Sequence, residues 1–279
     1  TLGLGAVAST GCGKYSISNI RSLKAFQDAN NHYRKGEYRQ AITRYEDSVR
    51  FNPDLGFAFF FLGNSYDQLY KPARKGEADN DALLPKAVEN YRIAIDKMKA
   101  ATDPKEQEIR QLAYEYLIDA YSAQKLNDFS KAEPIALELV SLDPSDASNY
   151  HALGNLYEGQ GMYEQAEAQF QKAVQVQPAD PLGYQVLAGF YNRQGEFDKT
   201  MAAFMERAKV EPNNPEAWHT MSTFYSEKVL KDKTLAKPKQ VEYVQAGISA
   251  EDKALALNAD YHDAIVFKNI LLRQMALLV

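Results

Sequence analysis

The sequence has little cysteine, histidine and tryptophan, and it has no excess of basic residues. Its 279 residues include one cysteine, one tryptophan and four histidines. A single cysteine cannot form a disulfide within the chain, so cysteine content leaves the redox compartment undecided. The formal net charge is −5, whereas a protein that holds nucleic acid through phosphate contacts usually carries a basic surplus. The composition therefore argues against a nucleic-acid partner.

The sequence also lacks the spacings that mark a catalytic or metal-binding centre. His32, His151, His219 and His262 lie far apart, and none belongs to an H-E-x-x-H motif or another metal-ligand spacing. No G-x-S-x-G motif is present, and the lone Cys12 lies near the start of the chain, so no nucleophile stands out. We therefore expect no catalytic residue, no metal and no cofactor.

The stretch Ala8–Tyr15, which reads ASTGCGKY, contains a Gly-Lys pair like that of a phosphate-binding loop. Such a loop needs G-x-x-x-x-G-K-[ST], because its glycines let backbone N–H groups surround the phosphates and its final hydroxyl binds Mg²⁺. When Gly13 and Lys14 are aligned with this motif, Ala8 replaces the first glycine and Tyr15 replaces the hydroxyl residue. The pattern thus excludes a nucleotide site of this kind.

No apolar run reaches the roughly 18 residues that would cross a bilayer as a helix, but the start of the chain suggests a lipid anchor. Residues 1–11 carry no charge and are mostly small or apolar, as at the end of a signal-peptide hydrophobic region. Ser9-Thr10-Gly11-Cys12 resembles the lipobox of bacterial lipoproteins, with Ser9 where leucine is usual. The resemblance implies an acylated Cys12 and an exported, membrane-anchored protein, periplasmic or on the cell surface. The alternatives are secretion with cleavage after Ala6-Val7-Ala8, and a leader with a chance cysteine.

The body of the chain repeats itself at an interval of 34 residues. Four series of residues keep this interval: Tyr150, Tyr184 and Trp218; Tyr157, Tyr191 and Tyr225; Gly161 and Gly195; and Pro144, Pro178 and Pro212. A fixed period of this length is typical of repeat proteins built from stacked helical pairs.

Residues 147–180 are the clearest copy of the repeat. They contain Tyr150-x-x-Leu153-Gly154-x-x-Tyr157, followed by Gly161, Ala166-x-x-x-Phe170 and Pro178. This pattern resembles the tetratricopeptide repeat (TPR) family, whose pattern is W-x-x-L-G-x-x-Y, A-x-x-x-F and P. The resemblance implies two antiparallel helices per repeat and a role in binding other proteins.

Physical reasoning about the same residues agrees with the resemblance. The four residues of the first motif follow the spacing i, i+3, i+4 and i+7, so they share one helix face. The small residues Gly154 and Ala166 let two helices approach closely, Gly161 suits the turn between them, and Pro178 ends the second helix. A single pair cannot bury its apolar stripe alone, so neighbouring pairs are expected to stack.

The sequence therefore predicts an all-α fold, a TPR-type α-solenoid of about six helix-turn-helix repeats with a C-terminal capping helix. The expected boundaries are a leader or tether at 1–21, a solenoid over 22–279 with repeats at 22–55, 56–101, 111–146, 147–180, 181–214 and 215–260, and the cap at 261–279.

The TPR resemblance also implies which residues line a concave groove, because the first helix of each repeat exposes fixed positions there. Carried onto this sequence, these are Phe26, Asn30, Tyr33, Arg34, Phe57, Phe60, Asn64, Gln68, His151, Asn155, Glu158, Gln185, Asn192, Arg193, His219 and Glu227. Their mixture of aromatic, amide and charged groups suits a protein or peptide partner. Phe26 stands where TPRs that grip chaperone C-terminal carboxylates need a lysine, so that partner is not expected.

Two insertions, Lys71–Pro85 and Lys228–Glu242, separate the paired helices of the second and sixth repeats. Insertions at one structural point project from one edge of a solenoid, often the edge that binds. The second insertion carries lysines that would contact an acidic partner surface or anionic lipid headgroups. These are Lys228, Lys231, Lys233, Lys237 and Lys239. The alternative is a solvated loop.

Together these features predict a non-catalytic protein–protein interaction scaffold or accessory subunit, exported and tethered through Cys12 in a bacterial cell-envelope assembly. Its partners would be other proteins or peptides, bound through the groove and the insertions. Two alternatives stay open: a soluble cytoplasmic TPR adaptor, and a ligand-binding or enzymatic module carried on the solenoid.

Overall fold

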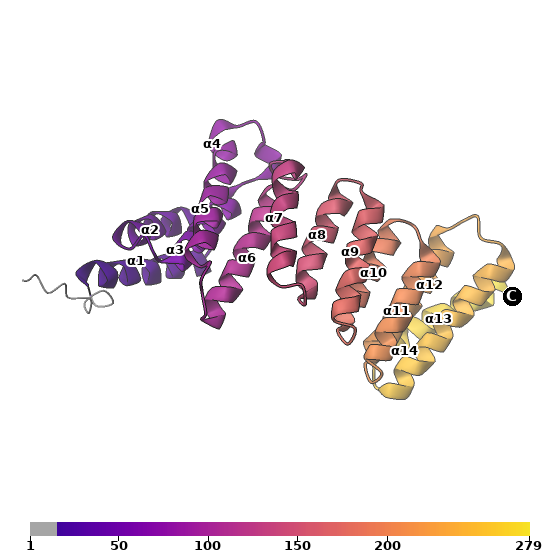
Figure 1. Ribbon diagram of the computed structural model, residues 1–279. Helices are drawn as coiled ribbons and strands as arrows, with labels where there is room; N and C mark the ends of the chain where they lie inside the picture. The colour runs from indigo at the N-terminus through magenta and orange to yellow at the C-terminus, as the bar shows by residue number, and fades with distance from the viewer. Residues whose placement is uncertain (1–15) are drawn as a thin grey trace, which may run out of the picture. The chain divides into compact units, whose positions relative to one another are not determined.

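The computed structural model describes residues 16–279, and this part of the chain is a succession of α-helices (Figure 1). The predictions for Cys12 and for Ala6-Val7-Ala8 lie outside the described residues. The chain forms two compact units. The first runs to Asp143 and includes Asn155–Met162, and the second comprises Pro144–Gly154 and Tyr163–Val279. None of the helices in residues 16–279 combines the length and apolarity that crossing a bilayer requires.

The first unit is built from antiparallel helix pairs. The pairs are α1 (Ile17–Arg34) with α2 (Tyr38–Phe51), α3 (Gly56–Leu69) with α5 (Leu83–Lys97), and α6 (Pro104–Ala120) with α7 (Phe129–Leu142). The short helices η1 (Pro72–Arg74) and α4 (Ala78–Asp81) lie between α3 and α5. Helix α1 thus starts before residue 22, where the first repeat is expected to begin.

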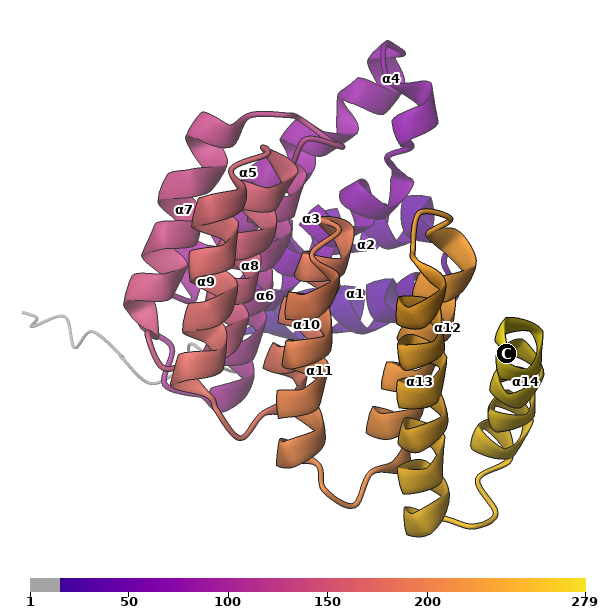
Figure 2. The same ribbon diagram turned by 90° about the vertical axis from the view of Figure 1, so that its right-hand side faces the viewer.

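The second unit continues the same construction. Its helices are α8 (Ala147–Gly159), which belongs to it as far as Gly154, α9 (Tyr163–Val176), α10 (Pro181–Arg193), α11 (Phe197–Val210), α12 (Pro215–Lys231), α13 (Lys237–Leu257) and α14 (His262–Leu278). Helix α10 packs on α11, α12 packs on α13, and α13 packs on α14. Figure 2 shows the helices α12, α13 and α14.

The helix ends follow from local sequence. Asp103, Asp180 and Asn214 each cap a helix by accepting a backbone N–H bond, and proline occupies the first turn that follows. The turns after the first helices of three pairs place Gly36, Gly161 and Gly195 at positive φ, between 72° and 76°. Asn127, at φ 52°, is the residue with positive φ before α7. Glycine and asparagine tolerate this left-handed backbone conformation, so the chain can reverse at these points.

Small residues and aromatic rings, spaced four apart on the second helices, form the core of the pairs. The combinations are Ala41 with Tyr45, Ala87 with Tyr91, Ala166 with Phe170, and Thr200 with Phe204. Each small residue is fully buried, and Thr200 satisfies its hydroxyl by donating to the Glu196 carbonyl oxygen at 3.0 Å. The predicted all-α, TPR-type fold is therefore confirmed.

Candidate functional site

The predicted groove residues lie in three kinds of environment. Exposed residues are Arg34, Gln68, Asn155, Gln185, Asn192, Arg193 and Glu227. Half-buried residues are Phe26, Asn30, Tyr33, Phe57, His151, Glu158 and His219. Phe60 and Asn64 are buried, so neither presents a side-chain surface to a partner.

Phe60 and Asn64 belong to the core of the first unit instead of a groove surface. The Phe60 ring lies 5.1 Å from the Phe61 ring and 6.0 Å from the Tyr91 ring, centroid to centroid. Asn64 Oδ1 accepts a hydrogen bond from Tyr33 Oη at 2.6 Å. Burial raises the pKa of Tyr33 to about 12, so its hydroxyl remains a donor at neutral pH. These two residues link α1, α3 and α5.

His219 likewise contacts residues within its own unit. Its Nδ1 lies 2.8 Å from Oε1 of Glu251, whose side chain is fully buried. The rings of Tyr261 and Phe267 meet the imidazole edge-on at centroid distances of 5.6 and 5.5 Å. Burial raises the pKa of Glu251, while the hydrogen bond with His219 opposes the shift. His219 therefore joins α12 to α13 and α14.

The second insertion lengthens two helices and leaves only a short connection. Helix α12 continues to Lys231 and α13 begins at Lys237, so residues 232–236 alone join them. The predicted contact lysines are divided among these parts, with Lys228 and Lys231 on α12, Lys233 in the connection, and Lys237 and Lys239 on α13. The insertion thus gives Lys228 and Lys231 a helical framework.

Asp232 fixes the connection at the end of α12. Its carboxylate accepts hydrogen bonds from the backbone nitrogen and the hydroxyl of Thr234 at 3.0 and 2.6 Å. Lys228 Nζ lies 2.9 Å from the same carboxylate. The Thr234 hydroxyl and Lys228 lower the pKa of Asp232 to about 2. The carboxylate is therefore ionised at neutral pH.

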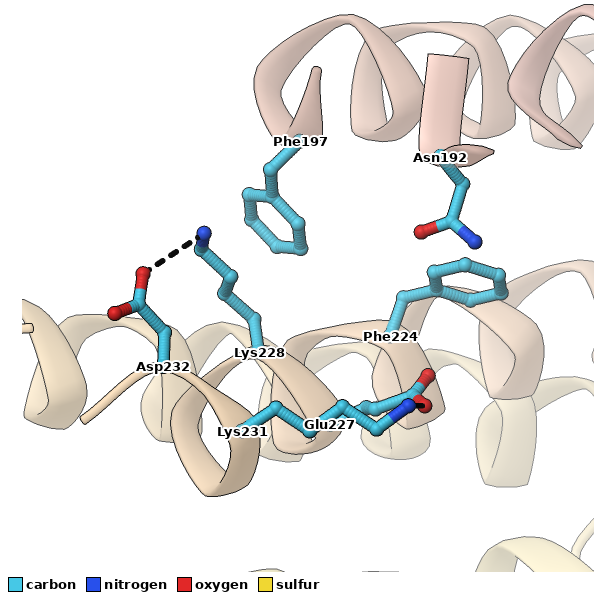
Figure 3. A pocket seen from close by; sticks show the side chains of 7 residues that line it. All are labelled: Asn192, Phe197, Phe224, Glu227, Lys228, Lys231 and Asp232. Carbon is cyan, nitrogen blue, oxygen red and sulfur yellow. Dashed lines mark hydrogen bonds and ion pairs between the residues drawn. The ribbon is translucent and has the colours of Figure 1, made fainter. Parts of the chain in front are cut away.

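A cavity of about 520 Å³ lies where the end of α10 and the start of α11 meet α12 (Figure 3). Its volume falls in the range of roughly 300–1,000 Å³ that is usual for ligand pockets. The lining residues are Asn192, Phe197, Phe224, Glu227, Lys228, Lys231 and Asp232. Four of them follow the spacing i, i+3, i+4 and i+7 along α12, so they share one helix face. The site brings together two predicted groove residues, Asn192 and Glu227, and two predicted contact lysines, Lys228 and Lys231.

The charges around the cavity are paired but accessible. Lys228 Nζ bonds Asp232 Oδ2 at 2.9 Å, and Lys231 Nζ bonds Glu227 Oε1. The side chains of Lys228 and Asp232 are 29% and 25% exposed, and those of Lys231 and Glu227 are more exposed still. Partly exposed ion pairs contribute little to stability. A charged group on a ligand can therefore replace one member of either pair.

Aromatic rings supply the apolar surface of the cavity. Figure 3 shows the Asn192 amide directed toward the Phe224 ring, and the Phe197 ring beside Lys228. The Lys228 ammonium lies 5.6 Å from the centroid of Phe197, and Phe224 packs on Phe204 at 4.8 Å. The Asn192 amide, which can donate and accept hydrogen bonds, therefore faces the Phe224 ring, and Phe204 holds that ring in place.

Sequence reasoning missed Phe197, Phe224 and Asp232 as lining residues. Phe224 lies three positions before Glu227, so helical spacing alone would have placed it on the same face. Phe197 follows the Gly195 turn, where no helical periodicity indicates the direction of a side chain. Asp232 follows the last residue of α12, and only the observed end of that helix reveals its position.

The first insertion lies beside a buried ionic cluster. Asp67, with a side chain 3% exposed, lies 2.6 Å from Lys125 Nζ and accepts a hydrogen bond from Tyr91 Oη at 3.3 Å. Lys125 Nζ also lies 2.6 Å from Asp119. Burial raises the pKa of Asp67, and the Lys125 ammonium opposes the shift. Because the carboxylate is already bonded to a lysine and a phenol, the cluster fits a structural role.

The titratable side chains in the described part of the chain do not gather into a metal-binding group. Among residues 16–279, no three His, Cys, Asp or Glu side chains gather closely enough to hold a metal ion. His151 packs against Phe170 with ring centroids 6.4 Å apart, and burial lowers its pKa. The cavity at α12 is taken as the candidate functional site because it combines residues expected from repeat position with lysines expected from the insertion.

Comparisons with known proteins identify one tetratricopeptide repeat in this chain. The tetratricopeptide repeat family model matches residues 147–180. Similar solved structures include PilW, a widely conserved type IV pilus biogenesis factor, at 18% identity and a TM-score of 0.49 over 88% of this chain and 97% of that one. MamA 41-end from Desulfovibrio magneticus RS-1 matches at 18% identity and a TM-score of 0.47 over 69% of this chain and 94% of that one. YrrB, a TPR protein with an unusual peptide-binding site, matches at 16% identity and a TM-score of 0.43 over 71% of this chain and 91% of that one. No curated protein matches the sequence.

Proposed function

We propose that this chain is a non-catalytic protein-interaction scaffold that binds a segment of a partner protein in the cavity between α10, α11 and α12. The observation that carries the proposal is that Asn192 and Glu227, expected from repeat position, line the same cavity as Lys228 and Lys231, expected from the insertion. Paired charges and aromatic walls suit recognition of a peptide.

The lining residues indicate the chemistry of the partner segment. An apolar or aromatic side chain would insert between Phe197 and Phe224 and leave water. The Asn192 amide would hydrogen-bond to the backbone of the segment. An acidic side chain of the partner would replace Asp232 or Glu227 as the counter-ion of a lysine. The expected ligand is thus a segment with an acidic residue close to an apolar anchor.

We further propose that the protein is exported and held at a membrane through an acylated Cys12, as an accessory subunit of a bacterial cell-envelope assembly. The resemblance of Ser9-Thr10-Gly11-Cys12 to a lipobox supports this part. Each buried CH₂ of an acyl chain contributes about 0.8 kcal/mol, so several chains on one cysteine hold a protein firmly. If Cys12 is unmodified, a soluble cytoplasmic adaptor is the alternative.

Peptide selection tests the binding site. A displayed random-peptide library is selected on the whole protein, and the affinities of enriched peptides are measured for wild type, for Lys228→Ser with Lys231→Ser, and for Lys233→Ser with Lys237→Ser. Only the first pair lines the cavity. We expect the first variant to bind roughly tenfold more weakly at low salt, with the difference shrinking as salt screens the charges. Equal losses in both variants, or enrichment of no peptide, would refute the proposal.

Mass spectrometry tests the tether independently. The protein is extracted from its source in mild detergent, and its N-terminal peptide and native mass are measured. An acylated Cys12 within a complex heavier than the chain alone is expected. An unmodified Cys12 would exclude the lipid anchor and favour the soluble adaptor, without affecting the peptide-binding proposal.

A further inference from the structure

The last helix, α14, carries apolar residues on two faces. On its inner face Leu271 is fully buried, and Phe267, Met275 and Leu278 pack on a cluster that includes Val244 and Ile248. On its outer face Val266 and Ile270 are each 46% exposed, and Leu277 is 87% exposed. Apolar residues gathered on one exposed face are a feature of interaction surfaces. The outer face of α14 therefore has the composition of a contact surface.

The spacing of the outer residues is that of a helix-packing stripe. Val266, Ile270, Arg273 and Leu277 follow intervals of four, three and four, so they form a single line along α14. Asp263 borders the same line one turn before Val266. Asp263 and Arg273 are both exposed, and neither forms an ion pair with any residue in the range 16–279. Lys268, by contrast, faces inward and lies 2.5 Å from Asp252.

We propose that two copies of this chain associate through the outer faces of their α14 helices, arranged antiparallel about a two-fold axis near residue 268. In that register Val266 of one copy lies opposite Ile270 of the other. Asp263 of each copy lies opposite Arg273 of the other, because both pairs of numbers have their midpoint at 268. A two-fold axis repeats each contact, so the interface contains two such ion pairs.

The charge pattern selects this arrangement over a parallel one. In a parallel pair of α14 helices, Asp263 would face Asp263 and Arg273 would face Arg273, and like charges in contact oppose association. The antiparallel register makes both charge contacts attractive and brings Val266 and Ile270 of the two copies together. The chain is therefore complementary to itself at this surface. This inference does not depend on the proposed peptide-binding function, because no residue of the cavity belongs to α14.

Sedimentation equilibrium of the whole chain tests the proposal through charge reversal. Wild type is expected to reach twice the mass of one chain. Asp263→Arg and Arg273→Asp should each weaken the dimer roughly tenfold or more, because each turns two attractions into two repulsions. Combining Asp263→Arg with Arg273→Asp restores opposite charges and should restore the dimer. Lys172→Glu, an exposed charge reversal on α9, is the matched control and should leave the mass unchanged.

The double reversal also separates loss of contact from loss of folding. Both single variants and the double variant are melted in parallel, and a dimer recovered in the double variant cannot be explained by misfolded single variants. Ile270→Glu, placed in the middle of the stripe, should give a monomer with a native circular-dichroism spectrum. A wild type that stays monomeric at the highest attainable concentration overturns the proposal. So does a dimer that is unaffected by single reversal, since another surface must then hold it.

Discussion

The two insertions occupy the same point of a repeat but fold in different ways. The first adds the short helices η1 and α4 between α3 and α5. It is held by Asn80, 2% exposed, whose side chain accepts from Lys71 N at 2.9 Å and donates to Lys71 O at 3.1 Å. The second extends α12 and α13 and is held by partly exposed ion pairs such as that between Lys228 and Asp232.

This difference shows that the position of an insertion does not determine its role. Buried polar groups must keep their partners, because an unsatisfied one costs about 1–3 kcal/mol. The first insertion is therefore needed for the stability of the structure around Asn80 and Asp67. The exposed pairs of the second insertion can be rearranged at little cost. The second insertion is free to take part in binding, and it is the one that lines the cavity at α12.

The largest effect is expected for Lys125→Met, which removes the cation from the cluster beside the first insertion. Asp67 then stays buried without its charged partner, and stability should fall by about 3 kcal/mol. Urea denaturation measures the loss. Lys131→Met is the control, because the ion pair of Lys131 with Asp128 is exposed to solvent, and this variant should unfold like wild type. The pKa of Asp67, followed by NMR, should rise further in Lys125→Met because the ammonium that lowers it is gone. An unchanged midpoint would mean that the cluster does not stabilise this unit.

A smaller effect is expected for Asn80→Ala, which removes both hydrogen bonds to Lys71. The variant should lose about 1–2 kcal/mol of stability. Hydrogen exchange of the backbone amides in residues 71–85 should accelerate selectively, because this side chain closes the insertion onto itself. Asn269→Ala, an exposed asparagine bonded only to its own helix, provides the comparison. Equal exchange in Asn80→Ala and wild type would contradict the account of the first insertion.

The sixth repeat contains its own buried carboxylate, and its pH dependence provides a third test. Burial raises the folded-state pKa of Glu251 above the ordinary value of 4.5. Its contribution to stability is therefore complete below that value and is lost as pH rises through the folded-state pKa. Glu251→Gln cannot ionise, so its stability relative to wild type should increase over the same interval. Denaturation curves from pH 4 upward measure the difference, and parallel curves would show that Glu251 titrates normally.

The smallest effect on folding is expected for Lys228→Ser in the second insertion. The pair it breaks is partly exposed, so the melting temperature should stay within error of that of wild type. Peptide affinity should nevertheless fall, as proposed above. A marked loss of stability would show that the second insertion is as firmly committed to the structure as the first.

Much of the fold follows from the sequence, because the repeat period fixes which residues face each other within a pair. The period predicted that Ala166 faces the first helix of its pair. It also predicted the close approach at Gly154, where an added Cβ would lie 2.7 Å from the Phe170 ring, so glycine is required at position 154. Thr200 could replace alanine because its hydroxyl bonds back to its own helix.

The functional surface follows less completely, because repeat position does not determine what covers a side chain. Phe60 and Asn64 hold family groove positions, yet the aromatic residues around them bury them. The cavity at α12 depends on where helices end and begin: Asp232 follows the last residue of α12, and Phe197 is the first residue of α11. Periodicity identifies faces of helices, whereas the ends of helices depend on local capping interactions.

The central claim is that the cavity bounded by Asn192, Phe197 and Phe224 receives the partner segment. The direct test is to fill it with Asn192→Trp and to measure the affinity of a selected peptide by calorimetry against Gln175→Trp, the same change at an exposed amide on α9 outside the cavity. The account predicts loss of binding in Asn192→Trp and wild-type affinity in Gln175→Trp, with both proteins melting normally. Undiminished binding by Asn192→Trp would contradict it.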